Sequence, residues 1–159
     1  MNPALSPRWI TPEFLEVCHP SIREIHAYWD AKRRGRHMPS RADIDPAEMI
    51  PFLPNLMLVD VASVEPLSLV YRLVGTREVT ARGNDPTGRT VAEAFYGRSL
   101  DGALGNYRAV IEGRAPVFDP DDKASPHGRL SERGSIFLPL SDDGETVNKV
   151  MVYTAYKAF

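Results

Sequence analysis

The pattern of apolar and polar positions changes its period along the chain. In the first third, Ile22, Ile25 and Trp29 recur at helical spacing within residues 21–34. This spacing predicts an amphipathic helix, and Gly35 is typical of the position just after a helix end. One face of such a helix is apolar and must pack against another part of the structure.

Farther along, the pattern becomes that of strands. Residues 56–61 and 67–74 are rich in β-branched and apolar side chains and flank a turn at Glu65-Pro66, so they are predicted to form an antiparallel hairpin. The second run stops at Gly75-Thr76 and is followed by the helix-permissive residues 77–82. A strand that breaks into short helical turns is typical of a sheet that wraps around a small cavity.

The same reading predicts further helices and strands on either side of these elements. A short helix is expected over residues 12–17 and a longer one over residues 99–112, and the other runs indicate strands over residues 115–118, 129–140 and 147–156. Five strands with helices inserted after the second define an α+β fold. At 159 residues, the length fits one domain.

Charge and cysteine content limit the partners and the compartment. The formal net charge of −2 predicts no general attraction to nucleic acid or to anionic membranes. A basic cluster at residues 32–36 is interpreted as a solvated helix end, with a nucleic-acid arm as the alternative. The single cysteine, Cys18, forms no internal disulfide, and no apolar run is long enough to span a bilayer. We therefore expect a cytoplasmic protein without a membrane span.

The residue types needed for catalysis or metal binding do not form a recognisable pattern. Cys18-His19 is the only adjacent Cys/His pair, and neighbouring residues at a helix end point in different directions. The four histidines lack the spacing of metal ligands. Arg129 and Arg133 are expected on one face of a strand, either meeting an anionic ligand or simply solvated. These observations predict that the protein is not an enzyme and holds no metal.

Several motifs occur in the order found in one known family. They are Tyr28-Trp29, Arg33-Arg34-Gly35, Met38-Pro39-Ser40-Arg41-Ala42-Asp43-Ile44-Asp45-Pro46, Leu53-Pro54, Tyr71-Arg72-Leu73-Val74-Gly75-Thr76, Asp85-Pro86-Thr87-Gly88-Arg89 and Leu138-Pro139-Leu140-Ser141. With these motifs the chain resembles a PAS domain. In particular, it resembles a stand-alone PAS-like family of alphaproteobacteria formerly catalogued as a domain of unknown function.

The resemblance implies a five-stranded antiparallel sheet with helices on one face, enclosing a pocket. Residues 1–36 would form an N-terminal helical extension, and residues 37–159 the PAS-like domain. Such extensions often mediate dimerisation, so the apolar face of Ile22, Ile25 and Trp29 is the expected interface of a homodimer. PAS domains are sensory or interaction modules, which implies a signalling protein as the partner.

The residues also bear on the cofactor that such a domain would hold. A light-sensing flavin PAS domain needs a cysteine beside the flavin ring, whereas Cys18 lies in the extension. Haem-binding PAS domains commonly use a histidine from the helix that covers the sheet, but residues 91–113 contain none, leaving Tyr107 or His127 as alternatives. The expectation is a small organic ligand of unknown identity, or a packed core, in place of haem or flavin.

Strand alternation and helical spacing select the candidate pocket residues. Alternation places Tyr71 and Leu73 on one face of their strand, toward the helices, with Arg72 facing outward. The other candidates are Leu104, Tyr107, Ile111, Leu138 and Tyr153. Ordinary core packing is the competing interpretation of all seven.

Three functions follow from these expectations. The first is a regulatory PAS protein that binds a small ligand or a protein partner and transmits its state through the N-terminal helix. The second is a pure dimerisation or interaction module with a packed core. The third, an acid–base enzyme, requires an acidic residue or histidine at an inward strand position, and the sequence predicts none there.

Overall fold

The computed structural model describes residues 8–10, 12–95, 99–120 and 130–158. An antiparallel sheet forms its centre, with the strand order β1-β4-β5-β6-β2-β3. The five predicted strands are present as β2 (Leu56–Val64), β3 (Leu67–Val74), β4 (Val117–Asp119), β5 (Leu130–Leu140) and β6 (Lys149–Ala158). A sixth strand, the two-residue β1 (Arg8–Trp9), pairs with β4 at the edge. The predicted α+β fold is confirmed.

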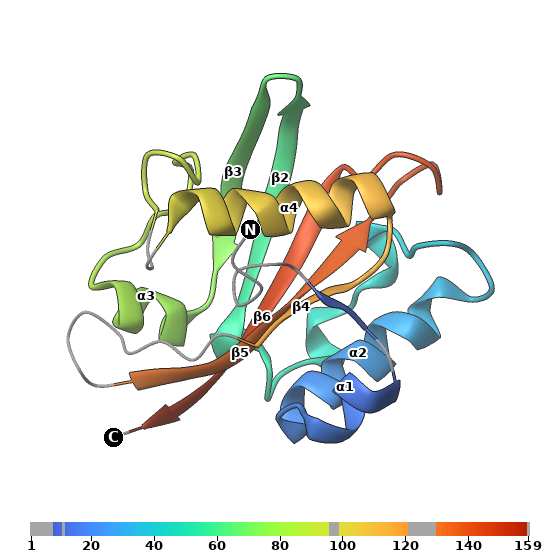
Figure 1. Cartoon of the computed structure of the whole chain (residues 1–159), viewed down its shortest axis with the longest axis horizontal. Coiled ribbons are helices and arrows are strands. Elements are labelled where there is room, and N and C mark those ends of the chain that lie inside the picture. Colours follow the sequence, from blue (N-terminus) through green and yellow to red (C-terminus); the bar gives the residue numbers. More distant parts are fainter. Residues whose placement is uncertain (1–7, 11, 96–98, 121–129, 159) are drawn as a thin grey trace.

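Helices cover both faces of this sheet, which differs from the expected helices on one face. We call the inner face the one that α3 (Thr76–Arg82) and α4 (Leu100–Gly113) cover, and the outer face the opposite one. Figure 1 shows α4 lying across the strands. On the outer face lie α1 (Pro12–Val17), α2 (Pro20–Arg33) and three short 3-10 helices, η2 (Arg41–Asp43), η3 (Pro46–Glu48) and η4 (Leu53–Asn55).

Ring contacts and side-chain alternation assign residues to the two faces. Phe137 packs edge-on against Tyr107 of α4, with ring centroids 5.2 Å apart, and so lies on the inner face. Tyr153 packs against Phe52 on the outer face, at 5.8 Å. Because successive strand residues point to opposite faces, each long central strand contributes side chains to two separate cores.

The apolar stripe of α2 is part of the outer core. Ile22, Ile25 and Trp29 are between 0% and 3% exposed, and the Trp29 indole Nε1 donates a 2.9 Å hydrogen bond to the carbonyl oxygen of Pro139 in β5. The expected homodimer interface is therefore wrong for these residues. The apolar face of α2 packs against the sheet of its own chain.

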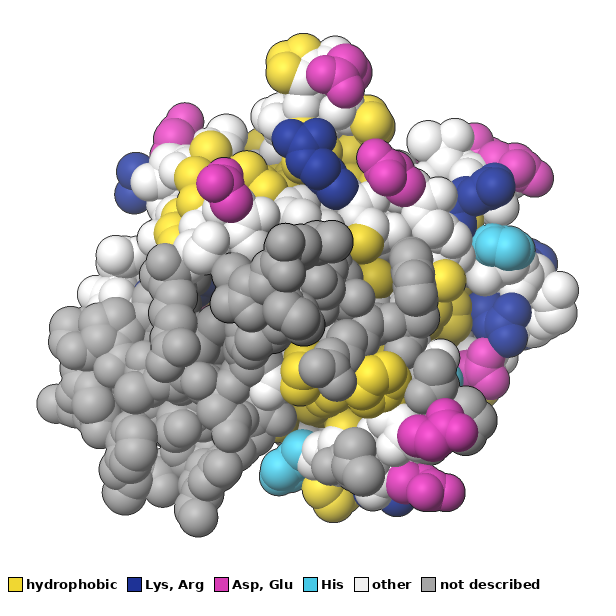
Figure 2. All heavy atoms as spheres, viewed as in Figure 1, with side chains coloured by type: hydrophobic (Ala, Val, Ile, Leu, Met, Phe, Trp, Pro, Cys, Tyr) yellow, Lys and Arg dark blue, Asp and Glu magenta, His cyan; other side chains and the backbone are white. Residues whose placement is uncertain are grey.

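The basic cluster at the end of α2 forms ion pairs with acids on nearby segments. Lys32 lies 2.9 Å from Glu48, and Arg36 lies 2.7 Å from Asp43. Figure 2 shows basic and acidic side chains interspersed on the face it presents. The pairing supports the interpretation of this cluster as a solvated helix end. Two other residues of the sequence analysis, His127 and Arg129, lie outside the described residues.

The end of β3 is packed directly against backbone. The Gly75 amide donates to the carbonyl oxygen of Leu56 at 2.7 Å, and a Cβ atom on Gly75 would lie 2.3 Å from the carbonyl oxygen of Pro54. The φ angle of Gly75 is −64°, so this glycine is required for space rather than for a left-handed backbone. Close contact with η4 thus marks the point where the strand becomes α3.

Replacing Ile25 tests the assignment of the α2 stripe to the core. We expect Ile25→Ala to lower the free energy of unfolding by about 2–5 kcal/mol, because a buried cavity is created. Ile50→Ala, at a side chain that is 65% exposed, should change it by less than about 0.5 kcal/mol. Urea unfolding measures both. An Ile25→Ala protein of unchanged stability but weakened self-association would restore the interface interpretation.

A pair of glycine substitutions tests the contact at the end of β3. Gly75→Ala should lower the free energy of unfolding by about 3 kcal/mol or more, since backbone atoms must move. Gly105→Ala, in α4 where a Cβ meets nothing within 4 Å, should raise it by about 0.5–1 kcal/mol because alanine favours helix. Thermal unfolding monitored by circular dichroism distinguishes them, and equal effects would contradict the close packing at Gly75.

Candidate functional site

A small cavity of about 60 Å³ lies between the inner face of the sheet and the helices α3 and α4. We refer to it as the inner cavity. Its lining is rich in polar groups, which is unusual for the centre of a domain. Those contributed by the helices are Glu78, Arg82, Asn106 and Tyr107, and those contributed by the strands are Tyr71, Asp119, Ser135 and Thr154.

Glu78 is a buried carboxyl group on the first turn of α3. It is 2% exposed, and its Oε1 accepts a 3.0 Å hydrogen bond from the Tyr156 hydroxyl. Arg82, one helical turn farther on, places its Nε 3.6 Å from Oε2. Burial raises the pKa of Glu78 above its ordinary value of 4.5, although Arg82 and the hydrogen bond from Tyr156 oppose that rise. Desolvation outweighs the ion pair because the carboxyl group has no access to water.

Arg82 connects α3 to β3. Its guanidinium stacks over the ring of Tyr71 at 4.8 Å from the centroid, and its Nη1 donates to the Tyr71 hydroxyl at 3.2 Å. The same nitrogen lies 3.4 Å from the carbonyl oxygen of Ala94. Burial disfavours the cation, but Tyr71 and Glu78 raise the pKa of Arg82 above its ordinary value. The cation is thus held beside the cavity by a ring face, a hydroxyl and a carbonyl oxygen.

Tyr107 contributes a hydroxyl group to the cavity from α4. The residue is 3% exposed, and none of the hydrogen bonds between described residues involves its hydroxyl. Burial raises the pKa of Tyr107 well above 10, with the neighbouring Tyr71 adding to the effect. The hydroxyl is therefore neutral and keeps its proton available as a hydrogen-bond donor inside the cavity.

The remaining polar groups of the lining are paired with one another. Asn106 Nδ2 donates to Asp119 Oδ2 at 2.8 Å, which ties α4 to β4. The hydroxyl groups of Ser135 and Thr154 lie 2.8 Å apart across β5 and β6. These contacts close the lining of the cavity along the sheet.

The predicted pocket residues do not all lie in the same place. Tyr71 and Tyr107 are brought together at the inner cavity. Leu104 and Ile111 are half-buried on α4 and pack against the hydrophobic core without lining that cavity.

Leu138 and Tyr153 are buried core residues on the outer face, where their strand positions pair with Met151 and Ile136. Six of the seven candidates therefore divide between two cores on opposite sides of one sheet.

Leu73 was predicted on the wrong face. It is 56% exposed and pairs with Leu58 on the outer face, while Tyr71 pairs with Val59 on the inner face. The register between β2 and β3 shifts between these pairs, so Arg72 is an extra residue in β3. A bulge of this kind breaks simple alternation. Arg72 does face solvent, and its Nε donates to Asp60 Oδ2 at 2.8 Å.

The two buried charges of the site were missed by the sequence analysis. An acid was expected only at an inward strand position, whereas Glu78 reaches the cavity from a helix. The available signal was the i, i+4 spacing of Glu78 and Arg82 in the short segment after Gly75. Such pairs are usually solvated, and only tertiary packing distinguishes a buried pair from an exposed one.

The family of the chain follows from comparison with known domains. A family model described as PAS domain matches residues 17–153. The chain belongs to the PAS domain family. PAS domains are in general sensory or regulatory modules, and no enzyme family is indicated for this one.

Comparison with individual proteins adds little to this assignment. No curated protein matches this chain significantly. Among solved structures it is similar to a chain in the structure of an RNA-binding light-oxygen-voltage receptor, with 14% identity and a TM-score of 0.46. That match covers 74% of this chain and 35% of the receptor chain.

Two features are absent from the described ranges. None of the helices there has the length and apolar character needed to cross a bilayer. In the same residues, no three histidine, cysteine or acidic side chains are grouped as metal ligands would be.

The raised pKa of Glu78 predicts a pH dependence of stability. A carboxyl group whose folded pKa lies above its unfolded value of 4.5 stabilises the fold fully below pH 4.5, and this stabilisation is lost as the pH rises through the folded pKa. Relative to Glu78→Gln, the wild-type free energy of unfolding should fall by about 1.4 kcal/mol per pH unit across that interval. Urea unfolding between pH 4 and pH 8 gives the difference curve.

The exposed Glu93 supplies a control for this measurement. Its carboxylate lies 3.9 Å from Arg89 on the surface, so Glu93→Gln should give a curve parallel to that of the wild type. If the Glu78→Gln and wild-type curves were also parallel, burial would not control the pKa of Glu78.

Proposed function

We propose that this PAS domain is a sensor that binds a small polar molecule in the inner cavity and passes its state to another protein by direct contact. The observation that carries the proposal is the buried Tyr107 hydroxyl, which faces the cavity without a hydrogen-bond partner among the described residues. A ligand that accepts a hydrogen bond from this hydroxyl would gain about 0.5–1.5 kcal/mol.

The size of the inner cavity limits the ligand. An engineered cavity of roughly 150 Å³ holds the six carbons of benzene, so about 60 Å³ has room for about two or three non-hydrogen atoms. Pockets for drug-sized ligands are roughly 300–1,000 Å³. The proposed ligand therefore has few non-hydrogen atoms and at least one hydrogen-bond acceptor. It has no aromatic ring system, because the cavity is too small for one.

The helix α3 provides a route from the cavity toward the rest of the domain. It carries both Glu78 and Arg82, which contact β6 through Tyr156 and β3 through Tyr71. A ligand that changes the hydrogen bonds of Arg82 would shift α3 relative to these strands. The stripe of α2 is buried, so the surface that contacts the partner is formed by other residues. A cytoplasmic location accords with the single, buried Cys18.

A second function is supported by the pairing within the cavity. Asn106 bonds to Asp119 and Ser135 to Thr154, so most of the lining is already satisfied by the protein. In that case water fills the small remaining space, and the domain acts only through interaction with a partner. The two functions differ in whether Tyr107 binds a solute.

Removal of one hydroxyl group separates these functions. Formate and formamide, each of three non-hydrogen atoms, serve as an anionic and a neutral probe. We expect at least one to raise the unfolding temperature saturably, and Tyr107→Phe to weaken its binding at least tenfold while leaving the ligand-free stability unchanged or up to about 1 kcal/mol higher. Thermal unfolding and isothermal titration calorimetry measure the two quantities.

Tyr28 supplies the matched control. Its hydroxyl donates to Glu48 at 3.0 Å on the outer surface, so Tyr28→Phe should bind the probe as the wild type does. Binding that survives Tyr107→Phe, or no saturable binding by either probe, would favour the interaction module with a water-filled cavity.

A further inference from the structure

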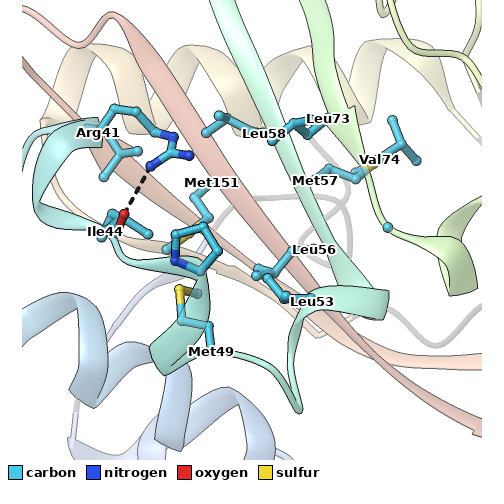
Figure 3. A pocket seen from close by; sticks show the side chains of 13 residues that line it. Arg41, Ile44, Met49, Leu53, Leu56, Met57, Leu58, Leu73, Val74 and Met151 are labelled. Atoms are coloured by element: carbon cyan, nitrogen blue, oxygen red, sulfur yellow. Dashed lines mark hydrogen bonds between the residues drawn. The ribbon is translucent and has the colours of Figure 1, made fainter.

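A second and larger cavity lies on the outer face of the sheet. This groove of about 220 Å³ is formed between the 3-10 helices η2, η3 and η4 on one side and the strands on the other. Figure 3 shows Arg41 on one side of it and Leu73 and Val74 on the opposite side, with Met151 between them. We call it the outer groove.

The outer groove has a deep apolar floor and an open rim. Met49 is 1% exposed and Leu140 0%, whereas Leu73 at the rim is 56% exposed. Its lining is mostly apolar, and methionine side chains adapt to ligands of irregular shape. An elongated apolar group therefore fits the groove with one end at the solvent-exposed rim.

Arg41 is the one charged residue that lines the outer groove in the described part of the chain. Its Nη1 donates to the carbonyl oxygen of Ile44 at 2.9 Å, which fixes the guanidinium in place. The Arg41 side chain makes no other hydrogen bond or ion pair with a described residue, so its other guanidinium nitrogens remain available. The planar guanidinium is suited to bind a carboxylate through two of them.

The acids closest to the groove in the chain differ in their partners. Asp43 accepts hydrogen bonds from Arg36 and Ser40, and Glu48 lies 2.9 Å from Lys32. Asp45, between the lining residues Ile44 and Pro46, accepts a hydrogen bond from the amide of Ala47. On the same face of β2 as Leu58, Asp60 lies between Lys149 at 2.6 Å and Arg72 at 2.8 Å, a cluster of net charge +1. Because Arg41 is the one charged residue in the lining, the described wall of the groove presents a cation to a bound molecule.

We propose that the outer groove binds a medium-chain alkyl carboxylate, with the chain on the apolar floor and the carboxylate on Arg41. An engineered cavity of roughly 150 Å³ accommodates the six carbons of benzene, so a volume of about 220 Å³ accommodates about nine. Octanoate matches this length. The outer groove shares one lining residue, Met57, with the inner cavity, and the proposal does not depend on the ligand proposed there.

Methionine methyl groups report directly on occupancy. In protein labelled with ¹³C at the methionine methyls, octanoate should shift the signals of Met49 and Met151 saturably, while Met38, buried elsewhere, should not move. Across hexanoate, octanoate and dodecanoate, affinity should rise about fourfold per methylene and level off beyond about nine carbons.

Substitutions separate the contribution of the head group from that of the chain. Arg41→Gln should weaken octanoate at least tenfold and change the affinity for octan-1-ol less than twofold. Arg89→Gln removes an exposed arginine that lines neither cavity and should leave both affinities unchanged, as should Tyr107→Phe. Leu73→Trp should abolish both by filling the groove, with the folded state checked by circular dichroism.

Several results would overturn the proposal. The first is that the Met49 and Met151 signals show no saturable shift up to about 10 mM octanoate, on the order of the weakest useful affinity. The second is that the Met38 signal shifts as much as theirs. The third is that Arg41→Gln weakens the binding of octanoate and of octan-1-ol equally. Shifts of Met49 and Met151 that follow protein concentration without any ligand would show that a second copy of the chain occupies the groove instead.

Discussion

The central strands β5 and β6 are buried on both faces, and the arrangement of both cavities depends on this. Phe137 and Val152 point to the inner core, whereas the paired residues Leu138 and Met151 point to the outer core. Adjacent residues of one strand thus belong to different cores. Both cavities are thus built on the same two strands, one on each face.

Buried charge distinguishes the inner core from an ordinary one. A buried ion pair is costly to desolvate, and it is tolerated when further hydrogen bonds satisfy both groups. Here Tyr156 bonds to Glu78 and Tyr71 to Arg82, so the short helix α3 is held to β6 and β3 by polar contacts. Such contacts are directional, and α3 therefore responds to a change in hydrogen bonding more readily than an apolar helix would.

The two cavities favour ligands of different chemistry. The inner cavity is small and polar, and its Tyr107 hydroxyl donates a hydrogen bond. The outer groove is larger and apolar, with one guanidinium. In a family whose members are generally sensory or regulatory, two such sites on one sheet would allow a small polar molecule and an amphiphile to act on the same strands.

The sequence by itself determined the elements, their order and the family. Hydrophobic periodicity and turn residues predicted five strands and the helices that begin at Pro20 and Leu100 to within a few residues, because these signals are local. It also found the two tyrosines of the inner cavity.

Only the tertiary structure decided what each helix face and each strand face packs against. The stripe of Ile22, Ile25 and Trp29 is equally apolar whether a second chain or the chain's own sheet covers it. One extra residue, Arg72, places Leu73 on the face opposite Tyr71, and the burial of Glu78 results from the packing of α3 against β6. Bulges and burial arise from contacts between residues far apart in the chain, which local periodicity does not record.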